Sequence, residues 1–174
     1  METTNKGRLF VLLRALDRLA GVLQKNHVPP VADVIKFVDE LWSSLAKNTI
    51  KIKLSPVKKA LTQSIVDEQD ASYEEVVRNM YLYAIGDLIE FVKEGRLDSL
   101  DAADESVVDL YDYVAGQKYV RENMESAAII LTKDDEERIR VDPDYQEGLA
   151  RISEDRKVAQ NISEWSEVLS RRFQ

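Results

Sequence analysis

The chain has 174 residues, of which 44% are hydrophobic and 32% charged, and its formal net charge is −8. This balance is typical of a globular protein rather than a disordered one, and the length allows a buried core without covalent crosslinks. Because the chain has no cysteine, it excludes disulfides, thiolate metal sites and a cysteine nucleophile.

Apolar residues recur at intervals of three and four along most of the chain, which is the period of an amphipathic helix. The first such segment spans about 4–24, and the prolines of "NHVPP" end it because proline cannot continue a helix. Arg14, Asp17 and Arg18 interrupt its apolar stretch, so we expect no signal peptide. No run of about 18 apolar residues follows, so no transmembrane helix is expected and a cytoplasmic location is predicted.

A second helix is predicted over about 31–45. A third is predicted to run to about residue 68, with Ser55 as its N-cap and Pro56 as its first residue. Ser72 and Glu75 have the spacing of a capping box, and Gly95 is placed to end the fourth helix that they begin. The many apolar positions of this fourth helix predict that it is central and buried on most sides.

A fifth helix is predicted over about 99–124 and a sixth from Asp142 and Pro143 to the end of the chain. Between them, residues 128–141 have two β-rich arms around a charged tip, which is typical of either a short β-hairpin or a mobile loop. About six helices with short connections predict an all-α bundle, with residues 1–174 forming a single domain.

The charge is unevenly distributed along the chain. Residues 1–66 have 11 basic and 5 acidic residues, residues 67–112 have 3 and 14, and residues 113–174 have 10 and 13. Residues 67–112 therefore have a net charge of −11, which exceeds the −8 of the whole chain. Such a field repels nucleic acids and attracts basic proteins, so we expect no nucleic-acid partner.

The stretch "RLDSLDAADESVVDLYDYV", residues 96–114, contains six carboxylates and one basic residue. At 100° per residue its apolar side chains share one helix face, while five acids lie within about 80° of arc on the opposite side. These five are Asp98, Asp101, Glu105, Asp109 and Asp112, and Asp104 lies between the two faces. Glu90 and Glu94 of the preceding helix are placed to extend the same acidic patch.

Three interpretations of these acids remain open. One is a solvated helix face, although the absence of any base on the stripe is unusual because like charges at helical spacing repel. Another is a docking surface for a basic protein. The third is a Mg²⁺ site of an all-α nucleotide hydrolase, with Asp87, Glu90, Asp101 and Asp104 as ligands at i,i+3 spacing.

The remaining side chains with chemical potential point to structural roles. His27, the only histidine, lies in a predicted surface turn, and a single loop histidine defines no catalytic triad or zinc site. Trp42 and Trp165 lie on apolar stripes and are predicted to be core residues. Tyr83 and Tyr113 fall away from the core stripes and are predicted to be exposed, and tyrosine is favoured at binding hot spots.

Three segments of the chain resemble the YjaG-like family of all-helical bacterial proteins. They are "FVDELWSSL" (37–45), "YLYAIGDLIEFVKEG" (81–95) and "DPDYQEGLARISED" (142–155). The third resembles that family's Pro-then-Glu helix start, at Pro143 and Glu147. Some relatives of this family occur beside bacterial polymorphic toxins, where they resemble immunity proteins, so the resemblance implies a toxin-binding role but no catalytic residue.

These observations lead to a hypothesis of a non-catalytic binding protein without a cofactor, most simply an immunity protein that neutralises a basic cognate toxin. Charge complementarity is assigned to the acids Glu90, Glu94, Asp98, Asp101, Glu105, Asp109 and Asp112, with Tyr83 and Tyr113 as aromatic anchors. The alternatives are the Mg²⁺-dependent nucleotide hydrolase and a structural or oligomerisation module.

Overall fold

The computed structural model describes residues 3–25, 27–29, 31–123 and 131–173. Within these residues the chain forms seven α-helices and one 3₁₀ helix and no strand, which confirms the all-α class, whereas the prediction of about six helices was too low. The elements are α1 (Thr3–Lys25), α2 (Ala32–Lys47), α3 (Leu54–Ser64), α4 (Tyr73–Glu94), α5 (Leu97–Asn123), α6 (Lys133–Arg140), α7 (Pro143–Gln160) and the 3₁₀ helix η1 (Trp165–Arg171).

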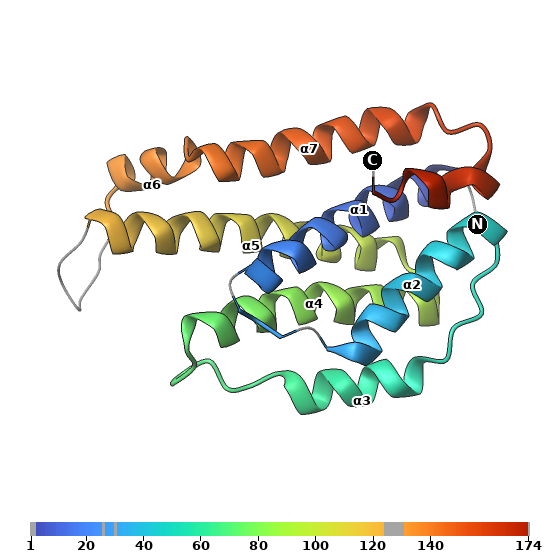
Figure 1. Cartoon of the computed structure of the whole chain (residues 1–174), viewed down its shortest axis with the longest axis horizontal. Helices are drawn as coiled ribbons and strands as arrows, with labels where there is room; N and C mark the ends of the chain where they lie inside the picture. Colours follow the sequence, from blue (N-terminus) through green and yellow to red (C-terminus); the bar gives the residue numbers. More distant parts are fainter. Residues whose placement is uncertain (1–2, 26, 30, 124–130, 174) are drawn as a thin grey trace.

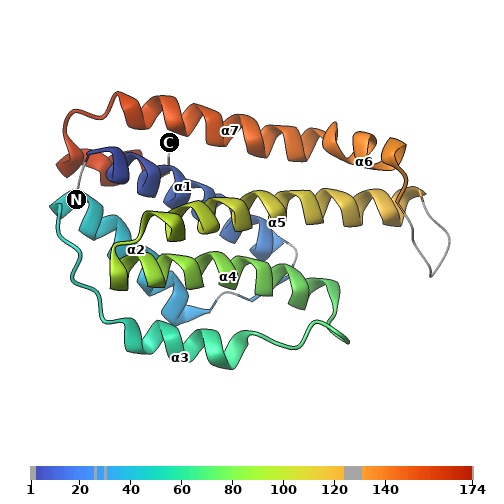
Figure 2. The same ribbon diagram turned by 180° about the vertical axis from the view of Figure 1, so that it is seen from behind.

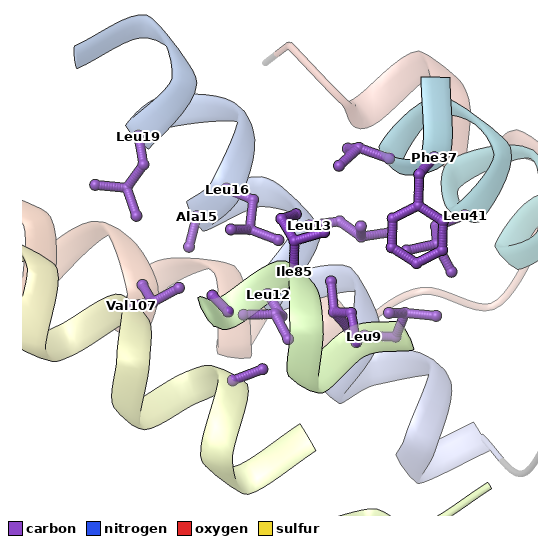
Figure 3. Close-up of a cluster of buried hydrophobic side chains, with 14 of the residues drawn as sticks. Leu9, Leu12, Leu13, Ala15, Leu16, Leu19, Phe37, Leu41, Ile85 and Val107 are labelled. Atoms are coloured by element: carbon purple, nitrogen blue, oxygen red, sulfur yellow. The ribbon is translucent and has the colours of Figure 1, made fainter. Parts of the chain in front are cut away.

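The helix α1 lies at the centre of the structure, in contact with α2, α4, α5 and α7 (Figure 1). The close-up in Figure 3 shows leucines of α1, among them Leu12 and Leu16, facing Phe37 of α2, Ile85 of α4 and Val107 of α5. These side chains are all buried and belong to one apolar cluster that extends over α1 to α5, α7 and η1. The sequence placed α4 at this position, but α1 is the helix that the others surround.

The helices α4 and α5 form an antiparallel pair, and the two caps predicted between residues 72 and 95 are confirmed. Ser72 accepts a hydrogen bond from the backbone N–H of Glu75, and the Glu75 side chain accepts one from the backbone N–H of Ser72. Gly95 ends α4 at φ 70°, a left-handed conformation that glycine adopts without steric cost. The tight turn that follows allows α5 to pack back along α4 (Figure 1).

The prediction of a β-hairpin or mobile loop near 128–141 was wrong for the described part, because residues 133–140 form α6. Thr132 and Asp135 make a second capping box, and hydrogen bonds from Thr132 and Tyr119 lower the pKa of Asp135 to about 2. The helix α6 has acids in its first turn and Arg138 and Arg140 in its last turn. Charges in this order interact favourably with the helix dipole, so the charged segment favours a helix over a turn. Residues 124–130 lie outside the described residues.

The last predicted helix does start at Asp142 and Pro143, but it does not continue to the end of the chain. The helix α7 ends at Gln160, and after a four-residue connection the chain forms η1, which packs on α2. This break places the buried Trp165 edge-on to Phe10, which also meets Trp42 edge-on. Both tryptophans are thus core residues, as predicted.

The third helix is shorter than predicted. It begins at Leu54, so Ser55 lies inside it rather than at its N-cap, and it ends at Ser64 instead of near residue 68. Beyond it, Asn79 of α4 donates to the backbone carbonyl of Val66 and accepts from its N–H, at 2.8 and 3.1 Å. Because Asn79 is buried, these two bonds hold residues after α3 in a non-helical conformation.

Close contact between α5 and α7 depends on a glycine. Gly148 of α7 is buried against the ring of Tyr111 on α5, and a Cβ atom at this position would lie 2.7 Å from Tyr111 Cε1. By contrast, apart from the adjacent backbone of α1 itself, no described atom lies within 4 Å of a Cβ built on Gly21 in α1, so the same substitution meets open space there.

We expect Gly148→Ala to destabilise the protein by about 1–2 kcal/mol, because overpacking against the Tyr111 ring outweighs the helix-propensity gain of alanine. Gly21→Ala, the matched control, is expected to raise stability by up to about 1 kcal/mol. Urea denaturation of both variants measures the difference, and equal shifts of the two midpoints would contradict it.

Candidate protein-binding face

The predicted acidic stripe of α5 consists of Asp98, Asp101, Glu105, Asp109 and Asp112, and all five side chains are exposed, as expected. Leu100, Val107 and Leu110 on the opposite side of the helix are buried. Figure 2 shows α5 and α4 side by side on one side of the molecule, with α5 not covered by another helix along its outer surface. The helix therefore presents its carboxylates to solvent.

The first two acids of the stripe are neutralised within the protein. Asp98 accepts hydrogen bonds from Nε and Nη2 of Arg96, at 3.0 and 2.5 Å. These two bonds lower the pKa of Asp98 below its ordinary value. Asp101 forms an ion pair with Arg8 of α1. The stripe lacks basic residues in sequence, but the fold supplies one from a helix more than 90 residues away.

The two acids of α4 that were predicted to extend the stripe are also paired. Glu90 lies 3.4 Å from Lys58 Nζ of α3 and 3.1 Å from Lys93 Nζ, and the bond from Lys93 lowers the pKa of Glu90. Glu94 lies 2.7 Å from Lys93 Nζ and 3.7 Å from Arg96. These pairs reduce the field that the α4 acids project into solvent.

Three acids of the stripe differ from the others. Glu105, Asp109 and Asp112, which we name the unpaired acids, form no ion pair or hydrogen bond with any side chain of the described residues. They are exposed and follow one another at helical spacing, so their charges repel. The uncompensated field of the stripe therefore comes from its C-terminal half.

The two candidate tyrosine anchors differ in exposure. Tyr83 is 43% exposed, as predicted, and its hydroxyl donates a hydrogen bond of 2.8 Å to Glu68, which raises the pKa of the tyrosine. Tyr113 is only half-exposed, because its ring stacks on that of Tyr73 of α4 with centroids 6.1 Å apart. The prediction that Tyr113 is exposed was thus only partly right, since its ring helps to join α4 to α5.

The four carboxylates of the alternative Mg²⁺ site have separate partners. Asp87 accepts from Ser106, and burial raises its pKa, while Glu90 and Asp101 are paired as described above. Asp104 lies 3.6 Å from Arg156 of α7, and burial raises its pKa as well. Among the residues that the structure describes, no three His, Asp or Glu side chains form a group that could hold a metal ion.

Several functional groups were not found from the sequence. Arg8 and Arg156, which meet acids of α5, come from the two ends of the chain, and the single-letter pattern gives no sign of either pairing. Asp155 is 3% exposed and lies between Arg14 and Arg18 of α1. The one usable signal was the pair Arg14 and Arg18 on an otherwise apolar segment, because cations at such positions need an acid partner.

No described helix is both long and apolar enough to cross a membrane. Comparison of the chain with protein-family models, with curated proteins and with solved structures gives no match in any of the three.

Proposed function

We propose that the protein is a non-catalytic binding protein that docks a basic partner protein on the acidic stripe of α5. One observation carries the proposal: Glu105, Asp109 and Asp112 are exposed without a cationic partner among the described residues, whereas the neighbouring acids are neutralised from within. Repulsion between like charges at this spacing costs about 0.2–0.5 kcal/mol per pair in a helix. A basic partner that meets these charges would offset that cost and gain speed of association.

The narrower form of the proposal names the partner as a toxin and the chain as its cytoplasmic immunity protein. Toxins that act on nucleic acids or nucleotides have basic substrate-binding surfaces, which an acidic stripe complements and blocks. The resemblance of three segments to the YjaG-like family, some of whose relatives resemble immunity proteins, supports the same conclusion. In this proposal Tyr83 of α4 is the aromatic anchor, because it is exposed and its hydroxyl is held by Glu68.

A pull-down from host lysate tests the proposal with three forms of the chain. The first is the wild type, and the second is Glu105→Gln, Asp109→Asn, Asp112→Asn. The third, a matched control, is Glu154→Gln, Glu164→Gln, Glu167→Gln. It removes three exposed acids, one in α7, one just before η1 and one in the first turn of η1. We expect a protein of basic isoelectric point to be retained by the wild type and the control and lost by the second form.

The retained protein is then purified, and its affinity for the three forms is measured over a range of salt concentrations. Affinity that falls with salt for the wild type and the control, but hardly for the second form, supports docking on the stripe. Retention of the same proteins by all three forms would mean that the stripe is only a solvated helix face.

A further inference from the structure

A cavity of about 540 Å³ lies on the side of α5 opposite the acidic stripe. It opens between α1, α5 and α7, which contact one another along this side of the molecule (Figure 1). Its volume is far larger than a single inorganic ion needs and lies within the range of about 300–1,000 Å³ that is usual for small organic ligands.

Positive charge dominates the lining of this cavity. The cations Arg18, Lys25, Lys118, Arg121 and Arg151 line it together with only two carboxylates, Asp144 and Glu147. The lining therefore has a formal charge of +3, five cations against two acids, in a chain whose net charge is −8. Such a concave basic site concentrates anions against the overall field of the protein.

Two of the five cations are neutralised at the rim. Lys118 Nζ lies 2.9 Å from both Asp142 and Asp144, and Arg151 is paired with Glu147 one helical turn away. The Lys118 pairs connect α5 to the start of α7, whereas the pair of Arg151 with Glu147 lies within α7.

The other three cations, Arg18, Lys25 and Arg121, have fewer acid partners than positive charges. Lys25 and Arg121 form no ion pair with any acid in the described ranges. Arg121 Nε donates a hydrogen bond of 3.3 Å to the backbone carbonyl of Gln117, and its guanidinium lies over the ring of Tyr73, 4.9 Å from its centroid. Arg18 has Asp155 as its carboxylate partner, which it shares with Arg14. The cavity thus has two cations, from two different helices, that are available to an anion.

Part of the cavity lining is aromatic or apolar. The ring of Tyr111 packs directly on Gly148 of α7, in the space that a Cβ atom would otherwise occupy. Val22 and Val114 complete this part of the lining. A ligand that fits therefore has an anionic group and an uncharged body.

We propose that this cavity binds a small organic phosphate monoester, with Lys25 and Arg121 as the residues that hold the phosphate. A monoester has a charge of about −1.5 to −2 near neutral pH, which matches the two cations that have no acid partner among the described residues. Its organic part lies along Tyr111 and Val114. The proposal is independent of the proposed protein-binding function, because the two sites lie on opposite sides of α5.

Isothermal titration at constant ionic strength tests the proposal with AMP, inorganic phosphate and adenosine as probes. We expect AMP to bind, inorganic phosphate to bind no more tightly than AMP, and adenosine not to bind. Lys25→Gln, Arg121→Gln is expected to weaken AMP binding by about tenfold or more, because charge-assisted hydrogen bonds to phosphate are among the strong ones. Both residues are exposed, so circular dichroism should show an unchanged fold.

The matched control is Lys59→Gln, Lys157→Gln, which removes the same charge at exposed lysines that do not line the cavity. It should bind AMP as the wild type does. Equal loss of binding in both double variants would assign the effect to net charge and overturn the site. Absence of binding of both AMP and inorganic phosphate to the wild type would overturn it as well.

Discussion

Replacing Asp155 with alanine is expected to lower the free energy of unfolding by about 3–5 kcal/mol, which is a large part of the stability of an ordinary domain. The carboxylate is 3% exposed and lies 3.1 Å from Arg14 Nε and 2.6 Å from Arg18 Nη1. Its removal leaves two half-buried guanidinium groups without an acid. Nε and Nη2 of Arg18 already have no hydrogen-bond partner in the described part of the chain, so the fold offers no substitute.

The effect should reach the C-terminal segment, because Arg14 also donates to the backbone carbonyls of Arg171 and Arg172. Arg172 in turn forms a two-pronged pair with Asp17, at 2.8 and 2.9 Å. One buried acid thus holds α7 on α1 and positions the arginine that binds the end of η1. Limited proteolysis of Asp155→Ala is therefore expected to cut first near residues 161–173.

Urea denaturation measures the loss, with Glu147→Ala as the matched control on the same helix. Among the described residues Glu147 pairs only with Arg151, in an exposed i,i+4 pair, so its removal should change stability by less than about 0.5 kcal/mol. If Asp155→Ala does not fold, Asp155→Asn takes its place, because it keeps the shape of the side chain and one acceptor. Its loss of stability should be smaller than that expected for Asp155→Ala and larger than that of Glu147→Ala. A loss for Asp155→Ala as small as that for Glu147→Ala would show that the arginines are solvated and the carboxylate is dispensable.

Local chemistry explains which parts of the fold could be predicted. Capping residues act within three or four positions of themselves, so the ends of α4 at Ser72 and Gly95 and the start of α7 at Asp142 were correct. Residues 133–140 were predicted wrongly because the apolar residues on either side have a β-like pattern, whereas the capping box of Thr132 and Asp135 starts a helix there. The break after Gln160 was missed because Ile162, Trp165 and Val168 continue a helical spacing, although their burial requires the chain to fold back onto α2.

The candidate site shows the same division between local and distant effects. Helix geometry was enough to place five acids of α5 on an outward stripe, because their relative positions depend only on the helical period. Their compensation was not predictable, since the partner of Asp101 lies on α1 and that of Asp104 on α7. Asp98 and Asp101 of the stripe are therefore neutralised by arginines. The proposed contact is limited to the three acids without such a partner, Glu105, Asp109 and Asp112.

Reversing the unpaired acids to Glu105→Lys, Asp109→Lys, Asp112→Lys is expected to slow association with the basic partner by about 10- to 1,000-fold. The reason is that long-range attraction acts before contact, whereas dissociation depends on close contacts that these rim charges contribute little to. Surface plasmon resonance with the partner from the pull-down separates the two rate constants. The wild-type association rate should fall steeply with salt, while that of the variant should not fall.

The control Glu154→Lys, Glu164→Lys, Glu167→Lys makes the same change in net charge on α7 and the flank and first turn of η1. It distinguishes the local field of the stripe from the total charge of the protein, because both triple variants have a formal charge of −2 instead of −8. If docking uses the stripe, the control slows association far less than the first variant does. Equal slowing by both would show that the partner responds only to net charge, and an unchanged rate in both would place the contact on an uncharged surface.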